Sequence, residues 1–445
     1  MILISENKIG SRVEYLYKIM DNEKIITQQI ISFWATDVVK DEKTYFVLYN
    51  SNMVPIKEVF RFINIFMNNE SVNSRSIALY ALKFLFCYQA MIGKNLQDFN
   101  LQDLKMLQAF LRGQNRVGNS IGFENLTYRS AGTVNGYLGI YRKYLDYLKQ
   151  ENPWLSARNL TKFTSFSEND YEKKGKYKLN EKTKAEEVPM YISVDEYRKI
   201  IKIVREEYTN REEIIIRLMY ESGMRLGEVL GLTNEDIVIE KIDDEYQAVV
   251  YIRNRIKNNR HQKAKTCMDV ISKRTYKTKD YNTVNCGYQI VYISVELYDL
   301  IGEYIEDEHP TQREKNSINY FENTITDSVC GNEENFYIFL NSLGKPLSYN
   351  SWRNIIKDIF IKCGISVDTQ SKKHNLNHRF RHGFAMFQAK NLNLSVKETA
   401  ILMRHSSISS TYKYYRPTTT DAINIKTKFA KELYKEIPEL KKGEE

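Results

Sequence analysis

The sequence predicts a mainly α-helical chain with one small β-sheet, which belongs to an α+β domain in its second half. Three observations predict this fold class. Apolar residues recur at helical spacing through 53–158, a densely charged segment follows at 159–187, and only two short runs rich in β-branched residues lie beyond it, at 248–253 and 288–293. At roughly 150 residues per domain, a chain of 445 residues has room for two or three domains.

The first half combines an unassigned N-terminal extension with a helical domain. Residues 1–52 mix short apolar runs with charges and predict no regular element. From Pro55 the pattern is helical, and the domain ends near Trp154, so we bound it at 53–158. Its predicted helices are a stretch whose face carries Val59, Phe60, Ile63, Phe66 and Met67, and then Ile77 to Met91, Leu101 to Leu111 and Thr133 to Leu148.

The second half begins after a linker. Residues 159–187 carry dense mixed charge and few aliphatic side chains, which is typical of a solvated linker. Ser193 and Glu196 then form the capping-box pattern of a helix start, which opens a domain over 188–417. Further helices are predicted at Val295 to Ile305, Trp352 to Phe360, His378 to Lys390, Ser395 to Met403 and, as an amphipathic tail, within 418–445.

The stretch between the two predicted strands is strongly basic. Residues 251–280 hold ten Lys or Arg and two Asp, an excess of eight positive charges in a chain whose net charge is +9. Two interpretations remain open. The stretch is either a solvated hairpin or a surface for a polyanion, because unbalanced like charges repel one another unless an anion lies nearby.

Composition and missing motifs exclude several classes of protein. The five cysteines are spread singly, with no C-x-x-C pair, which favours a reducing cytosol over a disulfide scaffold. No apolar run approaches the length of a membrane span, and the N-terminus lacks a signal pattern. No phosphate-binding loop, dinucleotide fingerprint, zinc-protease or hydrolase motif occurs.

Histidine clustering marks a candidate site. Four of the six histidines, His374, His378, His382 and His405, lie within 32 residues, interleaved with arginines. The i, i+4, i+8 spacing of the first three could bind a metal, but no Cys or carboxylate completes such a site and neighbouring arginines would repel a cation. A packed junction of hydrogen-bonded histidines and a phosphate pocket built with arginine forks stay open as alternatives.

A phosphate pocket needs a nucleophile, and tyrosines follow this cluster. Tyr412, Tyr414 and Tyr415 come shortly after His405. A tyrosine can attack phosphorus and form a covalent phosphotyrosine, provided that cationic neighbours favour its phenolate. The residues alone do not choose among the three, in a chain with 32 tyrosines.

Three segments resemble the boxes of the tyrosine recombinases, the phage integrase family, in order and in one domain. Arg225 in Glu221-Ser-Gly-Met-Arg-Leu-Gly-Glu resembles the first box, and His378-Arg-Phe-Arg381 resembles its H-x-x-R box. Leu402-Met-Arg-His405 through Tyr414 resembles the third box, in which the nucleophile stands nine residues after the histidine, so the resemblance selects Tyr414. It covers about residues 55–417 and implies a helical core-binding domain followed by the catalytic domain.

Two positions depart from the family pattern, and one assignment has rivals. Arg404 stands where the family usually has glycine, and Phe380 where it usually has leucine. The family also uses a lysine on the β-hairpin. The segment from Arg255 to Ala264-Lys265 resembles that of transposon-borne members and selects Lys265, whereas Lys277 and Lys279 are alternatives further along the hairpin.

The resemblance implies a site-specific DNA recombinase, an integrase or transposase of a mobile element. Arg225 and Arg381 would clamp the scissile phosphate, His378 and His405 would exchange protons or bond it, Lys265 would protonate the leaving 5′ oxygen, and Tyr414 would form a 3′-phosphotyrosyl bond without any cofactor or metal. Glu228 is expected to be a structural partner of the pocket or a plain surface charge, and His382 a packing residue or an indirect hydrogen-bonding partner.

The expected partners are double-stranded DNA, a homo-tetramer on two DNA sites and accessory DNA-bending proteins, in the cytoplasm at the nucleoid. Residues 1–52 could form an arm-type DNA-binding module. Two other functions stay open: DNA relaxation like that of a type IB topoisomerase, and a non-catalytic DNA-binding relative.

Overall fold

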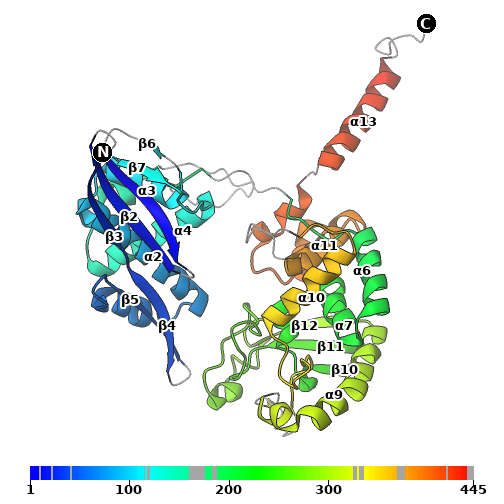
Figure 1. The fold of residues 1–445 in the computed structure, drawn as a ribbon. Helices are drawn as coiled ribbons and strands as arrows, with labels where there is room; N and C mark the ends of the chain where they lie inside the picture. Colours follow the sequence, from blue (N-terminus) through cyan, green and yellow to red (C-terminus); the bar gives the residue numbers. More distant parts are fainter. Residues whose placement is uncertain are drawn as a thin grey trace. The chain divides into compact units, whose positions relative to one another are not determined.

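The structure is a computed structural model, and it divides into two units. It describes all residues except 10–11, 22–23, 41–42, 115, 118–120, 160–175, 183–187, 324–327, 330–334, 368–375, 417–418 and 438–445. Met1–Ala185 form the first unit and Glu186–Glu445 the second (Figure 1).

The first unit contains a sheet in the region that the sequence left unassigned. Its strand order is β3-β2-β1-β7-β6; β1 pairs antiparallel with β2 and parallel with β7, and β4 and β5 form a separate hairpin. The strands are β1 (Ile2–Ile9), β2 (Arg12–Asp21), β3 (Lys24–Ile31), β4 (Trp34–Lys40), β5 (Lys43–Tyr49), β6 (Arg116–Val117) and β7 (Ile121–Glu124).

Helices share one hydrophobic core with this sheet. Ile4, Tyr15 and Phe46 from the strands belong to the same buried cluster as Leu82 and Leu107 from the helices. We expected residues 1–52 to form a separate N-terminal extension. In the structure they are part of the first unit, because β1 is paired with β7 and buried against the helical domain. The helical elements are α1 (Lys57–Arg61), a π-helical turn (Phe62–Phe66), α2 (Val72–Ile92), α3 (Leu101–Arg112), α4 (Ala131–Leu148) and α5 (Pro153–Ser156).

Most of the predicted linker lies outside the described residues. Its described parts include β9 (Lys176–Tyr177), which pairs with β8 (Arg158–Asn159). Arg142 of α4 stacks its guanidinium on the ring of Tyr177 at 3.6 Å, so this end of the segment is attached to the first unit.

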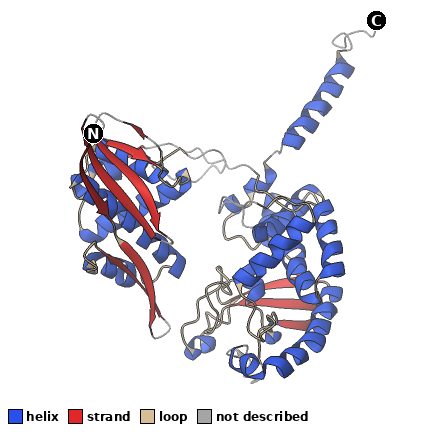
Figure 2. Cartoon of the chain, viewed as in Figure 1, coloured by secondary structure: helices blue, strands red, loops and turns tan. Residues whose placement is uncertain are grey.

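The second unit has helices around a three-stranded antiparallel sheet, ordered β10-β11-β12 (Figure 2). The expected start at Ser193 is confirmed, since its side chain and that of Glu196 form a capping box. Its strands are β10 (Ile237–Ile242), β11 (Glu245–Arg253) and β12 (Tyr288–Ile293), and its helices are α6 (Val194–Glu207), α7 (Asn210–Glu221), α8 (Leu226–Leu230), α9 (Val295–Asn323), α10 (Tyr349–Lys362), α11 (Leu376–Lys390), α12 (Val396–Leu402) and α13 (Thr419–Glu436).

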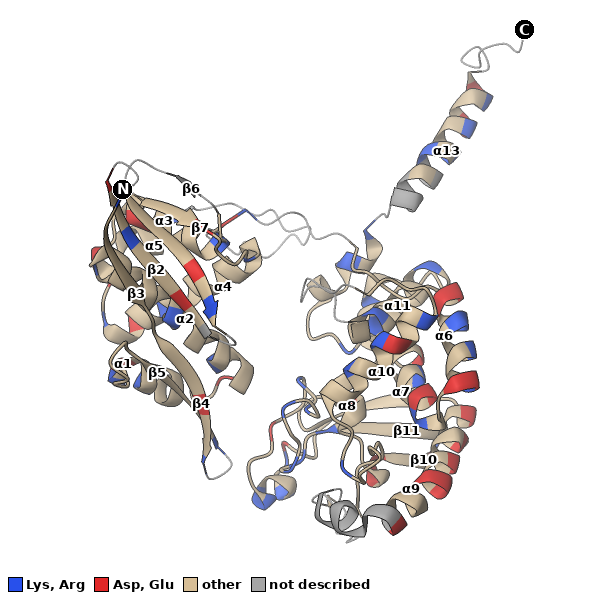
Figure 3. Ribbon diagram, viewed as in Figure 1, with Lys and Arg blue, Asp and Glu red and all other residues tan. Residues whose placement is uncertain are grey.

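The basic stretch between β11 and β12 is a folded loop with exposed cations (Figure 3). Two of its ten cations are structural: Arg255 is fully buried and bonds to Asp236 at 2.7 Å, and Arg253 pairs with the same carboxylate at 2.9 Å. Burial of a charge is tolerated here because each guanidinium has an anionic partner. Seven others are exposed, namely Lys257, Arg260, Lys265, Lys273, Arg274, Lys277 and Lys279.

Helix α13 confirms that the tail contains a helix. Ile423, Phe429 and Tyr434 are exposed on it. None of the described helices of the chain is long and apolar enough to cross a membrane.

Candidate active site

Arg225 stands at the first turn of α8. Gly223 makes the preceding turn with a φ of +59°, and a Cβ there would lie 2.3 Å from the ring of Phe384, so glycine is required both by conformation and by space. Arg225 then occupies the N-cap position, where its backbone N–H donates to the Glu228 carboxylate at 2.9 Å and its Nη1 donates to the same group at 2.6 Å.

Glu228 is a buried anion among arginines. Its other contact is Arg404, whose Nη2 lies 2.9 Å from Oε2. Burial raises the pKa of the Glu228 carboxyl, but the charges of Arg404, Arg225 and Arg381 outweigh it and lower that pKa to about 2. Glu228 is thus a structural partner of the pocket rather than a surface charge.

Helix α11 supplies Arg381. This side chain is buried, and it donates to the carbonyl oxygens of Gly223 and Met403, which ties the first and third sequence boxes together. Burial and the charges of Arg225 and Arg404 lower the pKa of Arg381 to about 9, although the charge of Glu228 opposes this change. The Arg381 guanidinium is therefore still protonated at neutral pH.

Of the three candidate tyrosines, only Tyr414 is buried in this cluster. Tyr412 is exposed. The hydroxyl of Tyr415 donates a hydrogen bond to the Leu394 carbonyl at 2.6 Å and is also hydrogen-bonded to Thr399. Burial raises the pKa of the Tyr414 phenol to about 12, against the charges of Arg381 and Arg225. The phenol is therefore protonated at neutral pH.

Two histidines lie beside Tyr414, and a third stacks on one of them. Nδ1 of His382 lies 2.9 Å from the Tyr414 hydroxyl, His405 lies parallel to its ring with centroids 6.4 Å apart, and His378 stacks on His382. Burial, reinforced by nearby cations, lowers the pKa of His378 and His405 to about 4 and that of His382 to about 3. All three rings are neutral at pH 7, so each can accept a hydrogen bond.

Lys265 is exposed on the loop between β11 and β12, and the residues before it are held firmly. The Asn254 side chain bonds to both the N–H and the carbonyl of Ala264, at 2.8 and 3.0 Å. The charge of Lys265 contributes to the lowered pKa of His378, which indicates that Lys265 lies near the histidines.

Glycines let this loop approach α8 closely. A Cβ on Gly231 would lie 2.2 Å from the carbonyl oxygen of Gln262, and one on Gly227 would lie 3.0 Å from that of Lys263. Gly227 and Gly231 therefore allow a close contact between helix and loop, which places the residues just before Lys265 against α8.

The structure thus brings together Arg225, His378, Arg381, His405 and Tyr414, with Lys265 beside them, while His374 lies outside the described residues. Sequence reasoning gave no role to Arg404, although its departure from glycine was a signal. Among the described residues, no group of three His, Cys, Asp or Glu could hold a metal ion.

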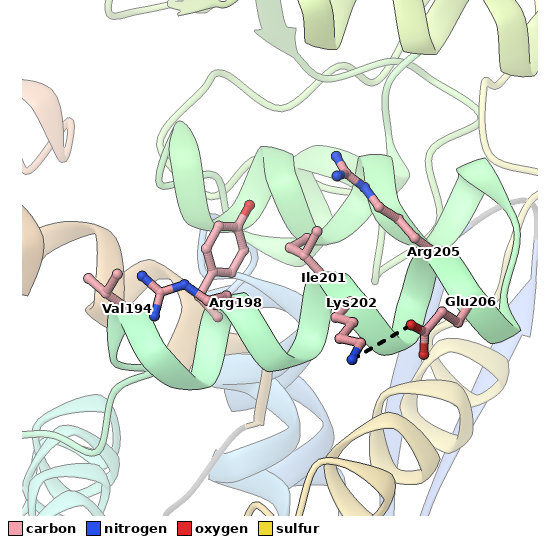
Figure 4. A pocket seen from close by; sticks show the side chains of 7 residues that line it. Val194, Arg198, Ile201, Lys202, Arg205 and Glu206 are labelled. Carbon is pink, nitrogen blue, oxygen red and sulfur yellow. Dashed lines mark ion pairs between the residues drawn. The ribbon is translucent and has the colours of Figure 1, made fainter.

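A groove along α6 is separate from this cluster (Figure 4). It contains none of the predicted site residues and includes an ion pair between Lys202 and Glu206 at 4.0 Å. Its lining residues all come from one helix, and they are Val194, Tyr197, Arg198, Ile201, Lys202, Arg205 and Glu206.

Comparisons with known proteins found a matching family, a similar transposase and similar solved structures. Residues 290–421 match the Phage integrase family. Transposase A from transposon Tn554 of Staphylococcus aureus is 24% identical over 343 residues, which cover 74% of this chain and 81% of that protein. Among solved structures, the Tn1549 transposon integrase in complex with transposon right end DNA is similar at 16% identity, with a TM-score of 0.49 over 84% of this chain and 99% of that one. A lambda integrase dimer bound to a core site has 12% identity and a TM-score of 0.45 over 81% and 94%.

Residues 290–421 therefore form a domain of the phage integrase family of tyrosine recombinases. Over most of its length the chain is similar in sequence to a transposase of a transposon.

Proposed function

We propose that this recombinase cuts and rejoins DNA at specific sites during integration, excision or transposition of a mobile element, with Tyr414 as its nucleophile. The observation that carries the proposal is the burial of Tyr414 between two arginines and three neutral histidines, with its hydroxyl 2.9 Å from His382. Arg225 and Arg381 bind the non-bridging oxygens of the scissile phosphate, because guanidinium groups match phosphate geometry and stabilise the charge of the transition state.

In the reaction, a bond forms between the Tyr414 oxygen and phosphorus while the bond from phosphorus to the 5′ oxygen breaks. The phenol proton leaves toward a neutral imidazole, for which His382 has the closest contact. Lys265 protonates the 5′ oxygen, and His378 and His405 bond the phosphate. Attack by the free 5′ hydroxyl of a partner strand reverses these steps and restores both the phosphodiester and Tyr414.

The exposed cations of the loop between β11 and β12 support contacts to the DNA backbone. Phosphate contacts of this kind position a duplex without reading its sequence. The first unit, the expected core-binding domain, would hold the duplex as well. Accessory DNA-bending proteins and a place at the nucleoid in the cytoplasm complete the proposal.

Strand exchange between two duplexes uses four active sites, so we expect a homo-tetramer. The exposed Ile423, Phe429 and Tyr434 of α13 favour a tail that docks on an adjacent protomer. Burying apolar surface stabilises an interface by about 25 cal/mol per Å², so a few such side chains would bias assembly on DNA.

The nucleophile is tested with a nicked suicide substrate that traps the covalent intermediate. Tyr414→Phe should form no covalent protein–DNA adduct and should still bind DNA, whereas the matched variants Tyr412→Phe and Tyr415→Phe should form it. Loss of the adduct in either control, with retention in Tyr414→Phe, would assign the nucleophile to another tyrosine.

Relaxation of DNA without strand exchange, as by a type IB topoisomerase, is the second candidate, since it uses the same phosphotyrosine chemistry. Recombination of two labelled sites, compared with relaxation of one supercoiled plasmid, separates the two functions. A chain that binds DNA and forms no adduct would be the non-catalytic relative.

A further inference from the structure

Arg404 has a backbone conformation that suits glycine better. Its φ is +51°, in the left-handed region that side chains rarely adopt, and the resembling family usually has glycine there. An arginine at a strained position indicates that its side chain has a use. Only 9% of that side chain is exposed.

The guanidinium of Arg404 reaches into the active site. Nη2 lies 2.9 Å from Oε2 of Glu228, and Nη1 lies 3.2 Å from the carbonyl oxygen of Ser222. Its buried Nε has no hydrogen-bond partner among the described residues. Arg404 therefore connects the segment of His405, the next residue, to the turn that precedes Arg225.

The carboxylate of Glu228 interacts electrostatically with three guanidinium groups. Glu228 bonds directly to Arg225 and Arg404, and the charge of Arg381 also acts on it. With Arg404 the group of four side chains has a net charge of about +2, and without it about +1, because each arginine contributes one positive charge and Glu228 one negative charge. Without Arg404, Glu228 would also pair with Arg225 alone and reduce the field that this arginine directs at a phosphate.

We propose that Arg404 is a positioning residue for the cleavage reaction, which shares Glu228 with Arg225 and so leaves Arg225 more of its charge for the scissile phosphate. The inference rests on the proposed function and goes beyond it, since it adds a residue that departs from the family pattern. Arg404 acts through Glu228 and Arg225 and need not touch the DNA.

The test compares two suicide substrates, one with an ordinary scissile phosphate and one with a neutral methylphosphonate at that position. A charge effect matters more for the anionic substrate, whose transition state carries more negative charge, whereas a structural brace matters equally for both. Removing one preorganised donor slows a reaction roughly 10²–10³-fold, so an indirect partner should matter less, about 10-fold.

The variants are Arg404→Met, Arg404→Gly and Arg404→Lys. We expect Met and Gly to slow cleavage of the phosphate about 10-fold and that of the methylphosphonate less than about 3-fold, each relative to wild type, and Lys to recover part of the loss because it keeps the charge. Glycine fits the backbone, so Arg404→Gly also tests the proposal if Arg404→Met does not fold.

Two control variants show whether the loss of any buried guanidinium, or the relief of any left-handed residue, changes the cleavage rate. Arg217→Gln removes a half-buried guanidinium that pairs with Glu221 at 2.8 Å, and Asn393→Gly relieves another left-handed residue, with a φ of +54°. Both should cleave the two substrates at the wild-type rate.

Phosphate cleavage at the wild-type rate by Arg404→Gly would overturn the inference. Equal slowing on both substrates would also overturn it, since Arg404 would then be only a brace. A wild-type chain that forms no adduct would instead refute the proposed function, so the two failures are distinguishable.

Discussion

At the scale of single residues, the candidate active site is built from groups whose burial opposes their charge. His378, His382 and His405 are held neutral and Tyr414 is held protonated, mainly because burial disfavours their charged forms. Spacing along the sequence selected Tyr414 by family resemblance, and burial now gives an independent physical reason, since Tyr412 is exposed and Tyr415 is occupied.

Spacing could not predict the contact of His382 with Tyr414, because the two residues stand 32 positions apart and meet only through the packing of two segments. Nor could it predict that Arg404 would turn back toward Glu228, since that depends on a positive φ. A residue whose role depends on tertiary contacts is not marked by a sequence motif, unless it departs from the residue that the motif usually has at that position.

The first prediction concerns His382. Its Nδ1 lies 2.9 Å from the Tyr414 hydroxyl, where a neutral ring can take the phenol proton. Asn places an amide oxygen at that position, which accepts a hydrogen bond and cannot take the proton. We expect His382→Asn to keep the tyrosine in place and to slow adduct formation about 10²-fold, within the range for general base catalysis, and His382→Ala to slow it further. Single-turnover rates from pH 6 to 9 measure this.

The pH profile distinguishes a base from a spacer. Hydroxide can replace a missing base, so the rate of His382→Asn should rise more steeply with pH than that of wild type. His309→Asn, at a buried histidine that contacts the Ile338 carbonyl, is the control for histidine loss. Parallel pH profiles for wild type and His382→Asn would leave His382 only a packing role.

At the scale of elements, the sequence predicted helices far better than strands. Helices α3, α4, α10 and α11 lie within a few residues of their predicted bounds because a buried stripe at helical spacing marks them. Strand β3 has no such mark: it exposes Ile25, Ile26 and Ile30 and buries only Ile31, so apolar and polar residues do not alternate. The pairing of β1 with β7 joins residues more than a hundred positions apart, which local patterns cannot reveal.

The second prediction concerns the contact between α8 and the loop. In Gly231→Ala, the new Cβ would lie 2.2 Å from the Gln262 carbonyl oxygen, which is backbone and cannot swing away. Overpacking of this kind typically costs about 1–3 kcal/mol, so the free energy of unfolding of the second unit should fall by that amount. Because Lys265 follows in this loop, adduct formation should slow as well.

Gly302→Ala in α9 is the matched control. Nothing lies within 4 Å of a Cβ at that position, and Ala in a helix is more stable than Gly by about 0.5–1 kcal/mol, so this variant should be as stable as wild type or more so. Denaturant unfolding measures both variants. If Gly231→Ala is as stable as wild type, the loop is free to retreat from α8.

At the scale of the whole molecule, each unit has a large hydrophobic core of its own among the described residues. The first unit ends at Ala185, inside the segment predicted as a linker, and it includes residues 1–52. Titratable groups are divided unevenly between the units. All six histidines, from His261 to His405, belong to the second.

The last prediction follows from this uneven division. In the folded second unit His378 and His405 have pKa values of about 4 and His382 about 3, whereas a histidine in an unfolded chain has a pKa of about 6.5. At pH values between these two pKa values, the unfolded chain binds more protons than the folded chain. The free energy of the unfolded state therefore falls relative to that of the folded state as the pH decreases. The histidine contribution to stability is thus fully present above about pH 6.5 and is lost as the pH falls toward 4. Calorimetry should show two transitions, of which only that of the second unit moves to lower temperature between pH 7 and pH 5, since the first unit has no histidine. Gly231→Ala identifies that transition, and His382→Asn should reduce its dependence on pH. Equal shifts of both transitions, or none, would mean that these rings do not stay neutral in the folded state.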